Sequence, residues 1–183
     1  LVGLPNAGKS TLISRITAAK PKIADYPFTT LHPNLGVVNQ DNKEFVVADI
    51  PGLIEGAHEG HGLGHRFLGH VERCKGLIHL IDITSKDITK DFSTIFNEIK
   101  AYDESLSKKK QIIVLNKIDA VDKDTIELAK KKLKKLGIKK VICISAVSGE
   151  NITTLIRKAQ DLIVSMLESE DNSNQLQNVS WSP

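Results

Sequence analysis

The chain has 183 residues, which is enough for one well-packed domain and too few for two ordinary ones. Hydrophobic residues make up 40% and charged residues 26%, the balance of a globular protein and not of a disordered one. A formal net charge of +3 is too small to indicate a nucleic-acid partner by itself. No apolar stretch approaches the roughly 18 residues that a membrane-spanning helix needs, so we expect no membrane span.

The chain opens on Leu1-Val2-Gly3 without a start methionine or a signal peptide, and these residues have the pattern of a strand that is ending. We therefore expect a piece of a longer protein with a truncated first strand. The two cysteines, Cys74 and Cys143, lie inside apolar runs. This pattern favours reduced thiols over a disulfide and predicts a cytoplasmic protein.

Apolar runs of strand length alternate with segments of helical period. Helices are predicted at residues 10–19, 63–74, 92–102, 124–136 and 152–167, and strands at 35–38, 44–48, 76–81, 111–115 and 140–144, the first two as a hairpin. This alternation implies an α/β fold with a mostly parallel sheet covered by helices on both faces. The polar stretch from Glu168 predicts a flexible tail or linker over 168–183, which leaves 1–167 as one domain.

A phosphate-binding loop is predicted first. Gly3 to Ser10 fits the pattern G-x-x-x-x-G-K-S between a strand end and a helix start, where backbone amides and the helix dipole attract phosphate. Lys9 would reach the outer phosphates and the Ser10 hydroxyl would hold Mg²⁺. This loop alone does not separate ATP from GTP. The residues expected to contact the nucleotide here are Gly3, Leu4, Pro5, Asn6, Ala7, Gly8, Lys9, Ser10 and Thr11.

A base-selecting motif, Asn116-Lys117-Ile118-Asp119, follows the apolar run 112–115. The Asp119 carboxylate can accept two hydrogen bonds from guanine, whereas adenine offers no such pair of donors. Asn116 would contact the base and tie loops together, and the Lys117 stem would pack along the ring. A second wall of the base site is predicted at Ser145, Ala146 and Val147.

A third motif, Asp49-Ile50-Pro51-Gly52, ends another apolar run. An aspartate in this position lies near Mg²⁺, usually through a water molecule, and the Gly52 amide can approach the γ-phosphate. Taken without the other motifs, Asp49 would be interpreted as a strand-capping residue in a turn.

The segments between these motifs resemble one family. KPKIADYPFTTLHPNLGVV (Lys20 to Val38) and DIPGLIEGAHEGHGLGHRFL (Asp49 to Leu68) are similar to switch I and switch II of the Obg, or CgtA, GTPases, and the resemblance extends through about Leu167. It implies a Ras-like P-loop NTPase fold with a six-stranded sheet. It also implies that Thr30 ligates Mg²⁺ and senses the γ-phosphate. The residues that would flank the nucleotide beside it are Phe28, Thr29, Leu31 and His32.

Two positions bear on mechanism. Leu53 stands where a water-orienting glutamine would follow in Ras-like proteins, and leucine cannot position water, so intrinsic hydrolysis should be slow. Asn6 occupies a loop position that helps to coordinate K⁺ in related GTPases, where the ion could neutralise developing charge. Potassium activation is a hypothesis by analogy.

These features predict Mg²⁺-dependent hydrolysis of GTP to GDP and phosphate, with Lys9, Thr30 and Gly52 in catalytic roles. The family resemblance implies a switch in large ribosomal subunit assembly and stress response that also binds guanosine tetraphosphate (ppGpp), and we expect a monomer. The alternative is a sensor of GTP, GDP and ppGpp that docks on the ribosome, with hydrolysis incidental. The lysine run from Lys130 to Lys140 is either a solvated helix face or a contact for rRNA phosphates.

Overall fold

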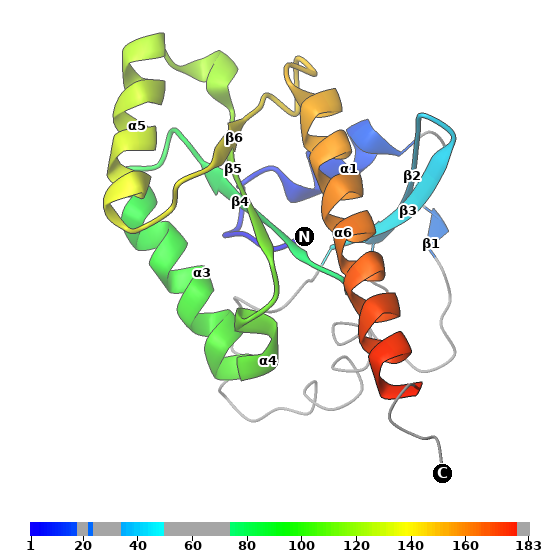
Figure 1. Ribbon diagram of the computed structural model, residues 1–183. Helices are drawn as coiled ribbons and strands as arrows, with labels where there is room; N and C mark the ends of the chain where they lie inside the picture. The colour runs from blue at the N-terminus through cyan, green and yellow to red at the C-terminus, as the bar shows by residue number, and fades with distance from the viewer. Residues whose placement is uncertain (18–21, 24–33, 50–73, 179–183) are drawn as a thin grey trace.

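The computed structural model describes residues 1–17, 22–23, 34–49 and 74–178. Figure 1 shows strands between two groups of helices, with α3 and α5 on one side and α1 and α6 on the other. The helices are α1 Lys9–Ile16, α3 Ile88–Tyr102, α4 Glu104–Ser107, α5 Lys123–Lys135 and α6 Ile152–Asn178, with a 3-10 helix η1 at Ile118–Ala120. The strands are β1 Lys22–Ile23, β2 Asn34–Gln40, β3 Lys43–Ala48, β4 Leu77–Asp82, β5 Gln111–Asn116 and β6 Val141–Cys143.

The predicted hairpin is formed by β2 and β3, which pair antiparallel from Leu35 opposite Ala48 to Gln40 opposite Lys43. The turn residues Asp41 and Asn42 both have positive φ, of 54° and 59°. Asparagine and aspartate tolerate this left-handed conformation better than other residues with side chains do, and paired left-handed residues match the twist of a hairpin.

A second, parallel sheet has the order β4-β5-β6, in the α/β arrangement that the alternation predicts. The expected single sheet of six strands is not confirmed, because the described residues form two sheets of three strands each. Leu1 and Val2 lie between them. The Val2 amide donates to Ile78 O (2.9 Å), and the Leu1 amino group donates to Ala48 O (2.6 Å). This segment makes a single isolated bridge to His79, which is too short to count as a strand.

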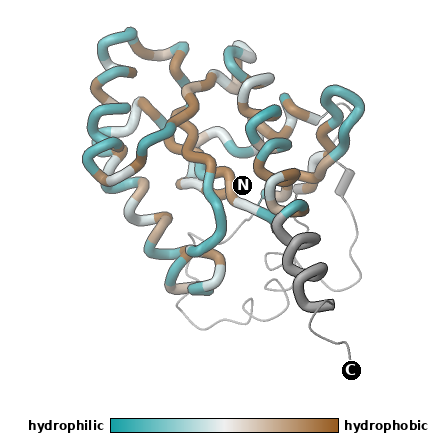
Figure 2. The backbone as a smooth tube through the Cα atoms, viewed as in Figure 1, coloured by the Kyte–Doolittle hydropathy of each residue, from teal (hydrophilic) through white to brown (hydrophobic). Residues whose placement is uncertain are grey.

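Apolar side chains pack on both faces of the parallel sheet. On one face, Leu12 of α1 and Leu155 of α6 join Leu80 of β4 in one buried cluster. On the other, Leu133 of α5 packs with Ile81 of β4. Neighbouring residues of β4 therefore serve opposite layers, as the two-residue period of a strand requires. Figure 2 shows the hydrophobic colour concentrated along these strands.

Two helices are longer than the sequence pattern predicted. α3 begins at Ile88, because the Asp87 carboxylate caps it by accepting hydrogen bonds from the amides of Thr89 and Lys90 (both 3.1 Å). α6 continues past the predicted end at Leu167 to Asn178, since no glycine or proline interrupts that stretch. The backbone is therefore helical where a tail was expected. The division into 1–167 and 168–183 stays a prediction.

Both cysteines, Cys74 and Cys143, are partly buried, and no disulfide joins them. That both thiols are reduced stays a prediction. Among the described residues, no helix is long and apolar enough to cross a bilayer.

Candidate nucleotide-binding site

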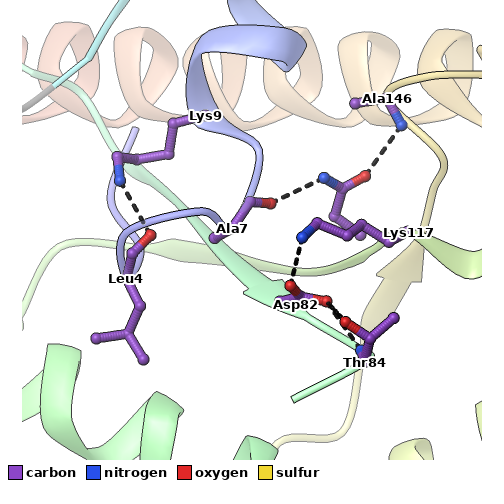
Figure 3. Close-up of polar contacts among 8 residues, drawn as sticks. Leu4, Ala7, Lys9, Asp82, Thr84, Lys117 and Ala146 are labelled. Atoms are coloured by element: carbon purple, nitrogen blue, oxygen red, sulfur yellow. Dashed lines mark hydrogen bonds and ion pairs between the residues drawn. The ribbon is translucent and has the colours of Figure 1, made fainter.

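The glycine-rich loop folds back on itself at the edge of the parallel sheet. The Lys9 ammonium donates to Gly3 O (2.8 Å) and Leu4 O (3.1 Å), so its side chain spans the loop (Figure 3). Gly8 has φ +95°, and a Cβ added there would lie 2.4 Å from Asn116 Nδ2. A side chain at this position would therefore be strained and would collide with the base motif.

Asn116 joins the two halves of the site. Its side-chain amide donates to Ala7 O (2.9 Å) and accepts from the Ala146 amide (3.0 Å). The Asn116 side chain is 2% exposed, so both bonds are shielded from water. Figure 3 shows Ala7 of the glycine-rich loop and Ala146 of the loop after β6, the two residues that these bonds reach. One side chain thus connects three segments that are far apart in the sequence.

The other residues of the base motif lie at the carboxyl end of β5. Lys117 adopts a left-handed conformation with φ 68°, which ends the strand. Its ammonium forms an ion pair with Asp82 of β4, a partner that none of the sequence motifs includes. Ile118 is buried, and Asp119 is exposed within η1.

The loop after β6 is held from both sides. Ser145 is fully buried, and its hydroxyl accepts from the Ser148 amide (2.9 Å). From α1, the Arg15 guanidinium donates to Ser148 O (2.8 Å). Gly149 has φ +90° beneath this guanidinium, where an added Cβ would lie 2.5 Å from Nη2. Val147 projects outward, with 69% of its surface exposed.

Lys9 and Asp49 provide opposite charges near the loop. Burial lowers the pKa of the Lys9 ammonium, and the Asp49 carboxylate opposes this shift. Asp49 is itself buried, at 6% exposed, while Ser10 in the first turn of α1 is exposed. The hydroxyl of Ser10 and the carboxylate of Asp49 are oxygen donors of the kind that Mg²⁺ prefers.

Some predicted site residues are exposed, and others lie outside the described residues. Pro5, Asn6 and Thr11 are exposed, and Asn6 has φ 63°. Residues 24–33 of switch I and 50–68 of switch II lie outside the described residues, and with them these predicted positions: Phe28, Thr29, Thr30, Leu31, His32, Ile50, Pro51, Gly52 and Leu53.

Asp82 and Arg15 are site residues that the sequence motifs do not include. Asp82 could have been found from its place at the end of an apolar run, because the parallel neighbour of that run ends at Asn116. Arg15 carried no sequence signal, since its contact with Ser148 joins residues 133 positions apart.

Comparison with known proteins identifies the family of the chain. The family model described as 50S ribosome-binding GTPase matches residues 1–117, well over half of the sequence. The chain belongs to this GTPase family. A second model, described as ethanolamine utilisation – propanediol utilisation, matches residues 77–161.

Solved structures similar to this GTPase domain share its fold. A protein described as nucleolar GTP-binding protein 1 from Plasmodium falciparum has a TM-score of 0.65 at 20% identity, with 98% of this chain and 93% of that chain covered. Era in complex with MgGDPNP and nucleotides 1506–1542 of 16S ribosomal RNA has a TM-score of 0.63 at 27% identity, with 85% and 53% covered.

A point variant of Aquifex aeolicus Era bound to GDP·AlF4⁻ gives a TM-score of 0.61 at 28% identity, with 85% of this chain and 53% of that chain covered. The GTPase domain thus spans about half the length of the Era chains. The shared architecture is that of Ras-like P-loop GTPases.

Proposed function

We propose that this chain is an Obg-type GTPase domain, a switch that binds guanine nucleotides and hydrolyses GTP slowly. The observation that carries the proposal is the double hydrogen bond of Asn116, to Ala7 O and from the Ala146 amide. It joins the expected phosphate loop to both parts of the expected base site. A nucleotide bound at one part would therefore meet a second part already in position, which reduces the cost of ordering the site.

Recognition of the phosphates is assigned to Lys9 and the loop amides. The partial burial of Lys9 strengthens its attraction for an anion, because water screens a half-buried charge less. When phosphate arrives, the ammonium would exchange its bonds to Gly3 O and Leu4 O for bonds to phosphate oxygens. Recognition of guanine is assigned to Asp119, which is exposed and able to accept two hydrogen bonds.

Mg²⁺ would be held by Ser10 and Thr30, with Asp49 bound to it through water. The ion, when bound, neutralises charge that develops between the β- and γ-phosphates. The buried Asp49 beside Lys9 and the exposed hydroxyl of Ser10 supply oxygen ligands suited to a hard cation. Asn6 is proposed to contact K⁺, and equal turnover in potassium and sodium salts would reject that part of the proposal.

The proposed partner is the large ribosomal subunit, reached in the cytoplasm by a monomer of the whole protein. The support is the family's description as ribosome-binding and the Obg-like switch segments. GTP, GDP and ppGpp are the proposed ligands, with a role in subunit assembly and stress response. The second candidate, a sensor with incidental hydrolysis, is favoured by Leu53, which offers no hydrogen bond to water.

Direct nucleotide titration tests the base assignment. Wild-type protein should bind fluorescent GDP and reject the adenine analogue. Asp119→Asn should move preference from guanine toward xanthine nucleotides, because an amide can donate to the additional xanthine oxygen. Unchanged guanine selectivity in this variant would refute the role of Asp119.

Single-turnover hydrolysis separates the two candidate functions. A switch should show faster GTP cleavage when 50S particles or potassium are added. A rate that responds to neither, together with tight nucleotide binding, would favour the sensor.

A further inference from the structure

Asp82 is the last residue of β4, beside the end of the parallel neighbouring strand β5. The register pairs Asp82 of β4 with Asn116 of β5, so the next residue, Lys117, is adjacent across the strand ends. The Lys117 ammonium lies 2.5 Å from Asp82 Oδ2. Figure 3 shows the Lys117 side chain ending on this carboxylate.

The Asp82 carboxylate is itself fixed. Its second oxygen, Oδ1, accepts hydrogen bonds from the Thr84 amide (2.9 Å) and the Thr84 hydroxyl (2.6 Å). Burial disfavours the charged carboxylate, but hydrogen bonds from Lys117 and Thr84 outweigh burial, so the pKa of Asp82 is lowered. Asp82 therefore presents a constant negative charge to Lys117 at neutral pH.

Lys117 has a long side chain that would otherwise sample many rotamers. Fixing such a chain costs up to about 2 kcal/mol of conformational entropy when it happens on binding. The ion pair already orders the Lys117 side chain in the free protein, so part of this entropy cost is absent when the nucleotide binds. The two side chains are only 33% and 20% exposed, so solvent screens the pair less than it would at the open surface. The aliphatic stem of Lys117 is then already extended when a base arrives.

We propose that Asp82 is a positioning residue for guanine-nucleotide binding, acting through Lys117. The role rests on the proposed nucleotide site, and it adds a residue outside the phosphate and base motifs. Asp82 does not touch the nucleotide in this proposal. It holds the lysine stem against the position of the base, and Thr84 holds Asp82.

A double-mutant cycle on the affinity for fluorescent GDP tests this role. Asp82→Asn keeps the shape of the side chain and removes its charge, so GDP affinity should fall about threefold to tenfold. Asp82→Glu keeps the charge and should lose less affinity than Asp82→Asn. In a Lys117→Met background, Asp82→Asn should have no further effect, because its only route to the nucleotide is gone.

Asp91→Asn is the matched control, since this aspartate of α3 lies near the same side of β4 and forms no ion pair with Lys117 within the described residues. It should bind GDP like wild type. Melting temperatures without nucleotide are measured for every variant, and Asp82→Ser, which also removes the charge, replaces Asp82→Asn in the cycle if the latter does not fold.

The outcomes are separable. Wild-type protein that does not bind GDP would reject the proposed function. Wild-type protein that binds, with Asp82→Asn unchanged or with losses that add to those of Lys117→Met, would reject the role of Asp82 alone.

Discussion

The carboxyl edge of the parallel sheet and the outer face of α5 use charge and polarity in opposite ways. At the sheet edge, Asn116 is 2% exposed and bonds to two distant segments. On α5, Lys131, Lys134 and Lys135 are exposed and form no ion pair with the described residues. The first region depends on individual buried hydrogen bonds. The second could act only through the sum of its charges, so its single residues should be replaceable.

The largest effect is expected at Asn116. Asn116→Ala would leave Ala7 O and the Ala146 amide without their buried partner, so the free energy of unfolding should fall by about 2–4 kcal/mol. GDP affinity should fall by about 100-fold. Urea unfolding and GDP titration measure the two effects.

Asn97→Ala provides the matched control for Asn116, because Asn97 is exposed on α3. Its unfolding free energy should stay within about 0.5 kcal/mol of wild type. Equal stability of the two variants would contradict the importance assigned to the sheet edge.

The buried His79 allows the comparison to be tested through the pH dependence of the unfolding free energy. It is fully buried on β4 and stacks on Phe92, with ring centroids 4.9 Å apart. Burial lowers the pKa of His79 to about 4, and the Gln111 side chain offsets this only in part. Neither ring nitrogen forms a hydrogen bond of ordinary geometry within the described part of the chain, Gln111 included.

Because the folded-state pKa of His79 lies below its ordinary value of 6.5, the unfolded chain binds the extra proton first. The contribution of His79 to stability is complete above pH 6.5 and is lost as the pH falls toward about 4. Between pH 7 and pH 5, wild type should lose about 2 kcal/mol more of its unfolding free energy than His79→Leu does. Parallel pH profiles for the two proteins would contradict the prediction.

A smaller effect is expected at Arg15, whose bond to Ser148 O is exposed. Arg15→Gln should leave stability within about 0.5 kcal/mol and raise the Kd for GDP about threefold, because the loop after β6 is held less firmly. Arg157→Gln is the control, since Arg157 is an exposed arginine paired with Asp41 in the hairpin turn. A Kd for GDP that responds equally to both changes would remove the special role of Arg15.

The smallest effect on stability is expected on α5. Replacing Lys131, Lys134 and Lys135 together by Gln should change the unfolding free energy by less than about 0.5 kcal/mol. These residues are spaced i, i+3 and i+4, so they share one face of the helix. If that face contacts rRNA phosphates, affinity for 50S particles should fall, and the slope of log affinity against log salt should decrease by about 2.

The control for α5 replaces Lys86, Lys90 and Lys100, which are exposed near or on α3. Equal losses of ribosome affinity in both triple variants would indicate a general charge effect. No loss in either would favour the interpretation of α5 as a solvated face.

The sequence by itself determined the local elements and the order of the motifs. Hydrophobic period identified the hairpin and the buried strands, because burial on one or two faces sets the spacing of apolar residues. The glycine-rich loop and Asn116 to Asp119 were recognisable because their chemistry requires fixed residues at fixed spacing. Helix ends were less well predicted, since Asp87 as a cap and the uninterrupted stretch to Asn178 are weak local signals.

Only the tertiary structure decided which distant residues meet. The ion pair of Lys117 with Asp82 depends on the register of β4 against β5, and the bond of Arg15 to Ser148 depends on α1 lying beside the loop after β6. It also decided that Leu1 and Val2 lie between two three-stranded sheets. Such contacts arise from packing between segments far apart in the chain, and no local pattern of residues encodes them.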